Sequence, residues 1–591
     1  MKPCYLSAAM RRTISNGTLT VFLITLAGCG DDAGSAKLAV EITSPTSTVY
    51  TRQTVTIQAI VTGGTADRLE LLRDGEALVT LAMPYQYAWD TSTEDEGEHA
   101  VVARAYRGDD AVDSDPRVVV VDRTAPTVAS HSPAVGDENV GVHQPIRVGF
   151  SEPIHPDSVR ETAVTMTGDA GVVPTTPSLS VDGLTLTVTP GTALAAPDVV
   201  TVALSAELTD LAGNPLTLEA DPWTFSFPEW LHLGDPLDAI PDGDSDARDA
   251  IVRLGADDQP VVAWGEDAPG VSGRSIQIAA WSAGEWVPYA EMNAQPAADL
   301  AMALDGAGTP ILAWGHYAVS DTLLRVQAWS GTDWRQLGGD LDAWTLSPAE
   351  TPTVAVDSSG ASVVAWSEYS STADARNVYV RRWNGDAWDS IGTSVSASAL
   401  ASTDAILPEL AIGPSDWILL TWAERIGGEL DVFVAEWTGS TWRLLGGGGL
   451  GVIASADARD PTLVFAGATP LVAWSEGDEV RVKRWGGTSW ASLDPLTDAD
   501  PLLSPRDPTL AIDPTGAPVV AWTEWHATAS KVLAYRYEAD SWSPLASGTV
   551  GFYGTTFVER PSLAIAPSGD VFLGLNDRSG DPRVHVLRLN Q

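Results

Sequence analysis

Short runs of alternating apolar and polar residues fill the first part of the chain, from residue 37 to about residue 122. Val40 and Ile42 alternate with polar neighbours, and the same period of two returns in TVTIQAIV (54–61) and HAVVARAY (99–106). A period of two places every second side chain on one face of a β-strand. Because turn-forming residues separate the runs, the pattern predicts a β-sandwich over 37–122.

A second block of short strand patterns covers residues 123–228 and ends in WTFSF (223–227). The segment DRTAP (122–126) joins the two blocks, and its proline restricts the backbone there. We therefore expect a second β-sandwich that follows the first through a short, stiff joint.

From residue 229 onward, one apolar phrase that ends in tryptophan and an acid recurs. Its copies are VVAWGE (261–266), ILAWGH (311–316), VVAWSE (363–368), LLTWAE (419–424), LVAWSE (471–476) and VVAWTE (519–524), with a weaker copy, VFLGLN, at 571–576. The tryptophans lie at 264, 314, 366, 422, 474 and 522, so the period is about 50 residues. A period of this length that is filled with strands predicts the blades of a β-propeller.

Each copy divides into four strands, a to d, which in the copy at 352–392 are PTVAV, SVVAWSE, NVYVRRW and AWDSIG. Aromatic residues bracket the hairpin between strands c and d, as in WNGDAW (383–388), and can stack across it. The seventh copy lacks strand d, and EWLHLG (229–234) matches DWRQLG (333–338). We therefore expect Trp230–Gly234 to complete the seventh blade and close the ring, which removes open sheet edges.

Two stretches resemble known families. The segment LLRDGEALVTLAMPYQYAWDTSTEDEGEHAVVARAY (71–106) resembles the bacterial Ig-like modules that are appended to exported enzymes and surface proteins. FSEP (150–153) together with DLAGN (210–214) resembles a second bacterial Ig-like type. The blades are similar in architecture to the kelch and sialidase-type propellers. These resemblances imply folds and name no activity.

The predicted fold class is all-β, with two Ig-like β-sandwiches followed by a seven-bladed β-propeller. The predicted divisions are a signal peptide (1–28), a lipidated tether (29–36), the two sandwiches (37–122 and 123–228) and the propeller (229–591), closed by the strand at 230–234.

The first residues predict export and lipidation. Lys2, Arg11 and Arg12 precede the apolar run LTVFLITLA (19–27), which is too short to span a bilayer as a helix. The run leads into LAGC (26–29), which resembles the lipobox of bacterial lipoproteins and implies cleavage before Cys29 and lipid attachment to it. The alternative is an ordinary secretory signal with an incidental cysteine. We expect a lipid anchor in the bacterial cell envelope, at the outer membrane or cell surface rather than the inner membrane.

The charge of the chain limits its partners. There are 78 acidic residues against 34 basic ones, which gives a formal net charge of −44. A surface of this sign repels polyanions, so a nucleic-acid partner is not expected.

Function is expected on one face of the propeller, because the b–c and d–a loops vary in length while the other turns are short. The last residue of the phrase lies where strand b enters this face, and arginines stand just before strand a. The candidate binding face consists of Glu266, His316, Glu368, Glu424, Glu476, Glu524, Arg248, Arg459, Arg506 and Arg560. These charges either pair with one another, which repeated positions favour, or form a ring that holds a cation or a polar ligand.

Several catalytic and metal-binding patterns are incomplete. Ser151 and Glu152 have no partner nearby in the sequence that could make a nucleophile. DGDSD (242–246) alternates acids as a calcium loop does, but Ala247 and Arg253 stand where such a loop needs glycine and a bidentate glutamate. No tyrosine–acid pair points to sialidase-type chemistry. We predict no catalytic residue, no metal site and no cofactor.

The acidic residues of the propeller occur at the same position in successive repeats. A catalytic site needs acidic residues that occur in one or two repeats and not in the others. The main expectation is therefore that the chain is not an enzyme, and that it presents a propeller face to a protein or glycan ligand. The alternative is a carbohydrate-active enzyme, a glycoside hydrolase or lyase, with the propeller as its catalytic domain.

Overall fold

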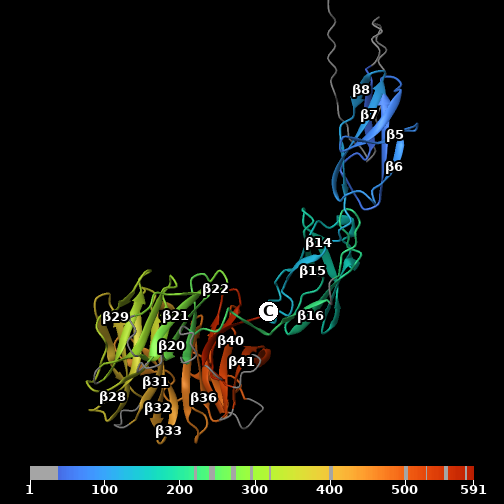
Figure 1. Ribbon diagram of the computed structural model, residues 1–591. Helices are drawn as coiled ribbons and strands as arrows, with labels where there is room; N and C mark the ends of the chain where they lie inside the picture. The colour runs from blue at the N-terminus through green and yellow to red at the C-terminus, as the bar shows by residue number, and fades with distance from the viewer. Residues whose placement is uncertain are drawn as a thin grey trace, which may run out of the picture.

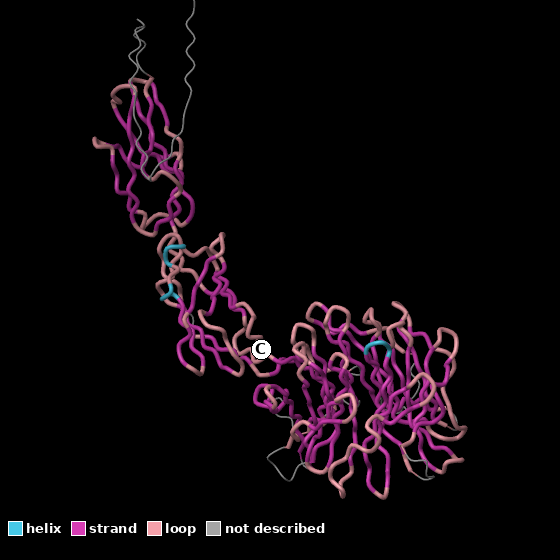
Figure 2. Tube along the Cα trace, turned by 180° about the vertical axis from the view of Figure 1, so that it is seen from behind, coloured by secondary structure: helices cyan, strands magenta, loops and turns pink. Residues whose placement is uncertain are grey.

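The computed structural model describes residues 37–218, 222–238, 246–267, 274–292, 297–318, 321–397, 403–497, 504–526, 529–550, 557–579 and 582–591. Figure 1 shows two small β-sandwiches in series, followed by a larger ring of sheets. Nearly all regular structure in the described residues is strand (Figure 2). The helices among them are three short 3-10 turns, at Pro156–Ser158, Glu161–Ala163 and Pro414–Asp416. None of the described helices is long and apolar enough to cross a membrane.

The first sandwich contains two sheets, with strand orders β1-β3-β6 and β2-β9-β7-β4-β5, and β8 pairs with β7. Its strands are β1 (Ala39–Ser44), β2 (Val49–Thr51), β3 (Thr54–Thr62), β4 (Arg68–Arg73), β5 (Glu76–Leu81), β6 (Gln86–Asp90), β7 (Gly97–Arg107), β8 (Asp110–Asp113) and β9 (Arg117–Val121). Alternate residues of β1 and β3 are buried, as the period of two predicts, and they pack around Trp89.

The second sandwich also has two sheets, with strand orders β10-β11-β15-β14 and β13-β12-β16-β17. Its strands are β10 (Val128–Ser132), β11 (Ile146–Phe150), β12 (Val164–Gly168), β13 (Gly171–Val173), β14 (Thr175–Leu179), β15 (Thr185–Pro190), β16 (Asp198–Leu204) and β17 (Trp223–Phe227). The phrase WTFSF forms β17, and its alternate residues Trp223, Phe225 and Phe227 are buried in the core.

The described strands after residue 229 form seven four-stranded units. Five are separate sheets, and the first two units are joined into one larger sheet by a single bridge between Arg274 and Ala297. The first three blades contain β19 (Asp246–Leu254), β20 (Pro260–Asp267), β21 (Arg274–Ser282) and β22 (Glu285–Pro288); β23 (Ala297–Leu304), β24 (Pro310–Tyr317), β25 (Thr322–Trp329) and β26 (Trp334–Gln336); and β27 (Ala349–Val356), β28 (Ser362–Ser370), β29 (Ala375–Trp383) and β30 (Trp388–Val395).

The next three blades contain β31 (Ala405–Gly413), β32 (Trp417–Ile426), β33 (Glu429–Trp437) and β34 (Trp442–Leu444); β35 (Ala458–Ala466), β36 (Thr469–Glu476), β37 (Glu479–Trp485) and β38 (Trp490–Ser492); and β39 (Ser504–Ile512), β40 (Pro518–His526), β41 (Ala529–Glu538) and β42 (Ser541–Val550). The last unit contains β43 (Val558–Ile565), β44 (Val571–Asp577), β45 (Arg583–Leu589) and β18 (Trp230–His232).

The last blade is completed by a strand from the beginning of the repeat region. Trp230 pairs with Leu589 and His232 with Leu587 in an antiparallel ladder, so β18 is strand d of the blade whose strand c is β45. The recurring phrase forms strand b of the blades, and its buried residues pack sheet on sheet around the ring. The predicted all-β fold class is confirmed.

The end of the chain contacts the second sandwich. The side chain of Asn590 accepts a hydrogen bond from Val142 N at 2.9 Å and donates to the carbonyl oxygens of Val140 and Pro228. Asn139 exchanges two further hydrogen bonds with the backbone of His232. The closing strand is therefore held by the sandwich before it as well as by its own blade.

Candidate functional site

Every blade carries a β-bulge in strand a, and the residue at this bulge has a left-handed backbone. The pairing register shifts there, for example between Arg459 and Thr462. The seven residues, called the bulge positions below, have φ between 45° and 58° and are Asp249, Asp299, Thr351, Leu407, Asp460, Asp507 and Arg560. Residues other than glycine adopt this conformation rarely, and bulges re-aim side chains. Here they bring one side chain from each blade to the mouth of the central channel.

The bulge positions line a cavity of about 440 Å³ at the centre of the ring. The layer below them contains the residues two further along each strand, which are Ile251, Ala301, Thr353, Glu409, Thr462, Thr509 and Ser562. Three of the hydroxyls in this layer accept a backbone N–H from the neighbouring blade, at 2.9 to 3.4 Å. Glu409 is the one ionisable side chain among the seven, so one blade differs from the other six at this position.

Glu409 faces the guanidinium of Arg253, which comes from a deeper position of the first blade. At the corresponding position the other blades carry small residues: Ala303, Ala355, Ala411, Val464, Ala511 and Ala564. Burial raises the pKa of Glu409 to about 6 although the charge of Arg253 favours the carboxylate. Burial also lowers the pKa of Arg253. The floor of the cavity therefore combines a carboxyl group that can hold a proton near neutral pH with a cation.

Asp460 and Asp507 occupy adjacent bulge positions. Burial raises the pKa of both carboxyl groups, and the charge of Asp460 adds to the effect on Asp507, whose pKa is raised to about 6. Asp460 accepts a hydrogen bond from the backbone of Asp507, which favours its charged form. Two neighbouring carboxyl groups with different environments can hold one proton between them near neutral pH.

The remaining charges at the mouth are paired. Asp249 accepts hydrogen bonds from Arg274 and Arg560, and this contact joins the first blade to the last. Asp299 accepts a hydrogen bond from the backbone N–H of Thr351 at 3.0 Å. The mouth therefore has a paired sector around Asp249 and a carboxyl-rich sector around Asp460 and Asp507.

The glutamates of the predicted binding face lie inside the blades. Glu266, Glu368, Glu424, Glu476 and Glu524 are at most 1% exposed. Each accepts a hydrogen bond from the indole Nε1 of the tryptophan two residues earlier, at 2.5 to 3.1 Å. Glu476 also accepts the N–H groups of Val452 and Ile453 in the d–a loop. The final residue of the phrase therefore anchors loops and presents no charge to solvent.

His316 takes the place of this glutamate in the second blade. It is 9% exposed, and burial lowers its pKa. Among the described residues, its Nδ1 and the Nε1 of Trp314 are buried atoms without a hydrogen-bond partner. The tryptophan–acid contact of the other blades is therefore missing here.

The predicted arginines lie at the expected face but do not pair with the glutamates of the phrase. Arg248 contacts Asp246 and Asp267, Arg459 contacts Asp457, and the guanidinium of Arg506 lies 4.3 Å from the ring centroid of Trp525. Arg560 alone occupies a bulge position and lines the cavity. The cavity-lining aspartates had one sequence signal, the pattern R-D-P-T at 459–462 and 506–509. In both copies the aspartate that follows the arginine lines the cavity.

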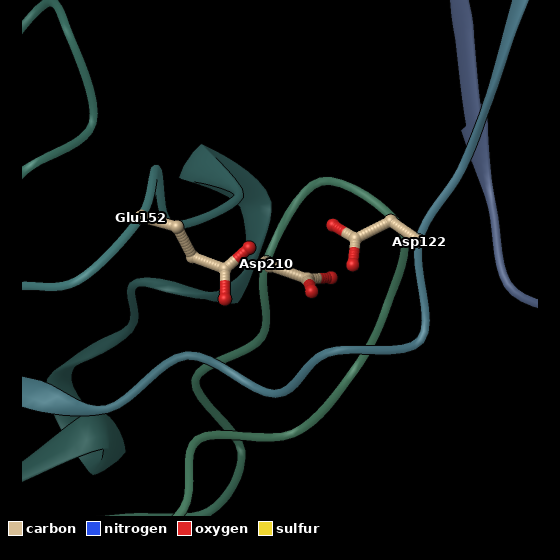
Figure 3. A group of neighbouring side chains, drawn as sticks. All are labelled: Asp122, Glu152 and Asp210. Carbon is tan, nitrogen blue, oxygen red and sulfur yellow. The ribbon is translucent and has the colours of Figure 1, made fainter. Parts of the chain in front are cut away.

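A second group of carboxylates lies at the joint between the two sandwiches. Ligand oxygens of Asp122, Glu152 and Asp210 lie within 4.8 Å of one another, and Figure 3 shows the three side chains converging from separate segments. Burial and the neighbouring charges of Asp122 and Asp210 raise the pKa of Glu152 to about 7. Carboxylates are the ligands that hard divalent cations take, so these three residues could hold one. Ser151 accepts a hydrogen bond from Thr127 N, a structural contact.

Two expected features fall outside the described residues. Cys29 and the lipid-attachment segment lie before residue 37, and most of the DGDSD segment lies in 239–245.

Comparison with solved structures finds glycoside hydrolases and a polysaccharide lyase among the similar chains. The α-L-arabinanase of Penicillium chrysogenum is 11% identical, with 59% of this chain and 95% of that chain covered and a TM-score of 0.36. The α-L-arabinofuranosidase of Fusarium graminearum is 14% identical, with 61% and 97% covered and a TM-score of 0.36. An ulvan lyase is 12% identical, with 60% and 93% covered and a TM-score of 0.37.

The prediction that the chain is not an enzyme is corrected. Its premise was that the acids of the propeller follow the repeat, whereas Glu409 in the cavity is an acid that departs from it.

No curated protein matches this sequence. Two family models match parts of it: the model described as "Bacterial Ig domain" matches residues 39–103, and the model described as "Bacterial Ig-like domain" matches residues 122–227. The first match lies within the first β-sandwich, and the second match spans the strands of the second β-sandwich. The chain therefore contains two bacterial Ig-like domains ahead of its propeller.

Proposed function

We propose that this protein is a carbohydrate-active enzyme that cleaves a glycosidic bond in the central cavity of the propeller. The observation that supports this is the pair Asp460–Asp507, two neighbouring carboxyl groups of raised pKa that line a cavity of about 440 Å³. Most enzymes that hydrolyse glycosidic bonds use two carboxyl groups, one of which must be protonated at the working pH.

In this proposal Asp507 is the proton donor to the glycosidic oxygen, because its pKa of about 6 keeps part of it protonated near neutral pH. Asp460, which accepts the backbone N–H of Asp507, is the carboxylate that takes a proton from the water that attacks the sugar carbon as the glycosidic bond breaks. Glu409 and Arg253 bind hydroxyl groups of the substrate at the floor of the cavity. The cavity has the size of a small-molecule site.

The proposal extends to the cellular setting. LAGC at 26–29 supports lipid attachment at Cys29, and the two Ig-like domains are spacers between the lipid and the propeller. The substrate in this setting is a glycan, or the glycan part of a glycoprotein, that reaches the bacterial cell envelope.

The test is the release of reducing ends by the full chain from a panel of neutral and acidic polysaccharides. Asp507→Asn is expected to lower kcat at least about a hundredfold, since general acid catalysis contributes roughly 10² to 10⁴. Activity should fall as the pH rises above about 6, because the proton donor becomes ionised. Asp386→Asn, at an exposed hairpin position outside the cavity, is the matched control and should keep full activity.

Two outcomes would overturn the proposal. One is that no polysaccharide of the panel is cleaved by the folded full chain. The other is that Asp507→Asn and Asp460→Asn both retain the wild-type kcat.

A further inference from the structure

A second cavity of about 440 Å³ lies on the third blade and shares no lining residue with the central one. Its wall is built from the loop before β27, the loop after β28 and the strands β29 and β30. Trp344 and Tyr379 supply aromatic surface, and Asn377 and Arg381 supply polar groups. Four small residues of β30 leave the space open: Ser390, Gly392, Thr393 and Ser394.

The polar and aromatic residues of this pocket are not part of the repeat. Asn377, Tyr379 and Arg381 alternate along β29 and so share one face of the sheet. At the position of Tyr379 the other blades carry Gln277, Arg325, Phe433, Arg481, Leu533 and His585, and at the position of Arg381 they carry Ala279, Gln327, Ala435, Lys483, Tyr535 and Leu587. The combination of tyrosine and arginine is therefore a local specialisation of the third blade.

The pocket is held rigidly. The indole Nε1 of Trp344 donates to the Tyr379 hydroxyl at 2.5 Å. The backbone N–H of Ala343 donates to the buried carboxylate of Glu368 at 3.1 Å, and the N–H of Trp344 donates to it as well. Arg381 donates to the carbonyl oxygen of Asp342 at 3.2 Å and lies over the ring of Trp366. A binding site works best when its side chains are fixed in this way before the ligand arrives.

The strand pairing itself creates the space. Tyr379 pairs with Ser394 and Arg381 with Ser390, so β30 bulges between these two points. A bulge next to a site re-aims side chains and ends the regular packing. The result is a concave surface with aromatic faces and hydroxyl, amide and guanidinium groups around it, which is the composition of a site for a small polar ligand.

We propose that this pocket binds one neutral sugar residue of a glycan, as a binding site separate from the central cavity. An aromatic face accommodates the apolar side of a sugar ring, and the surrounding donors and acceptors match its hydroxyl groups. A neutral sugar is favoured over an acidic one because the chain has a net charge of −44 and because Arg381 is already engaged by the Asp342 carbonyl. The proposal concerns binding and does not depend on catalysis in the central cavity.

The next blade supplies templates for variants that preserve the fold. Phe433 and Ala435 stand where the third blade has Tyr379 and Arg381, so Tyr379→Phe and Arg381→Ala place residues that the same architecture already accepts. Lys483→Ala makes the corresponding change in the fifth blade, outside the pocket, and is the matched control.

The experiment is a calorimetric titration of the full chain with the neutral tetrasaccharides of the cello, xylo, manno and arabino series, and with tetragalacturonic acid. At least one neutral tetrasaccharide should bind, and Tyr379→Phe and Arg381→Ala should each weaken it by roughly fivefold to tenfold. Lys483→Ala should leave the Kd unchanged. Three results would overturn the inference: no neutral tetrasaccharide binds, tetragalacturonic acid binds more tightly than all of them, or binding is lost in Asp507→Asn while both pocket variants keep it.

Discussion

The indole Nε1 of Trp286 donates a hydrogen bond to the carbonyl oxygen of Leu233 at 2.6 Å, and this contact joins the first blade to the strand that completes the last one. The same contact recurs between consecutive blades, as Trp334 with Ala290, Trp388 with Leu337, Trp442 with Ile391, Trp490 with Leu445 and Trp542 with Asp494. The junction of the first and last blades therefore uses a copy of the contact that joins five other pairs of consecutive blades.

Gly234 offers a test of this closure. Its φ is 68°, and an added Cβ would lie 2.9 Å from the ring of Trp281 and 3.2 Å from that of Trp286. Gly234→Ala should therefore separate β18 from the first blade. We expect a lower Tm and faster amide exchange in Trp230–His232 and Arg583–Leu589, since terminal strands stay ordered only when they are held.

Gly284→Ala is the matched control for this variant. Gly284 has a φ of 88°, so alanine meets the same backbone penalty of about 1 kcal/mol, but no atom lies within 4 Å of the added Cβ. The difference between the two variants isolates the contact with the tryptophan pair. Equal Tm values and equal exchange in β18 and β45 would contradict the role assigned to this contact.

The strands of the propeller and its closing strand could be predicted from the sequence because their signals are local and repeated. The apolar phrase marks strand b, the paired aromatics mark the c–d hairpin, and the match of EWLHLG to other d strands places β18. The β-bulge that turns side chains toward the channel mouth gave no such signal. A left-handed backbone predicts glycine, and none of the seven bulge positions is a glycine.

The glutamates of the phrase were expected at the propeller face, either paired with the arginines there or holding a ligand. The physical reason for their burial lies two residues earlier. In a strand, residues two apart share a face, so Trp474 and Glu476 point to the same side and the indole N–H finds an acceptor there. A buried tryptophan N–H needs a hydrogen-bond acceptor. This requirement could have predicted that the glutamate two residues later is buried, although its charge favours an exposed position.

Removing one of these carboxylates should destabilise the propeller. Glu476→Ala leaves three donors without their acceptor: the buried Trp474 Nε1, and Val452 N and Ile453 N in the loop. An unsatisfied buried donor costs about 1–3 kcal/mol, so a decrease of roughly 2 kcal/mol or more in the free energy of unfolding is expected from denaturant titration. Asp478→Ala, in the exposed turn that follows, should change it by less than about 0.5 kcal/mol. A loss below 1 kcal/mol for Glu476→Ala would argue against the anchoring role.

Lipid attachment at Cys29 is tested by Cys29→Ser in the full chain. LAGC at 26–29 follows a short apolar run, and mature lipoproteins are held at the membrane by the lipid on this cysteine. The wild type is expected in the membrane fraction after a high-salt wash, and the variant in the supernatant. Cys4→Ser, which changes the other cysteine of the chain, should fractionate like the wild type. Retention of the Cys29 variant in the washed membranes would rule out the lipid anchor.

The carboxyl group of Glu152 should make the joint between the Ig-like domains sensitive to pH. Its pKa is about 7 in the folded chain, where burial and the charges of Asp122 and Asp210 oppose ionisation, against an ordinary value of 4.5. The folded state then binds more protons than the unfolded state between these two values. Stability therefore falls as the pH rises from about 4.5 to about 7 and levels off above that range.

Glu152→Gln removes this dependence because the amide does not titrate. We compare the Tm of the second Ig-like domain in the variant and in the wild type, both in EDTA. The difference, variant minus wild type, is expected to rise between pH 5 and pH 8, because any pH-independent effect of the substitution adds only a constant. Glu161→Gln, at an exposed position of the same domain, should show no such change. Asp210 remains fixed in both variants by Ala212 N, Asn214 N and the Asn214 side chain, so the comparison concerns the charge at residue 152 alone. A difference between variant and wild type that stays constant from pH 5 to pH 8 would show that this carboxyl group is not held near neutral pH.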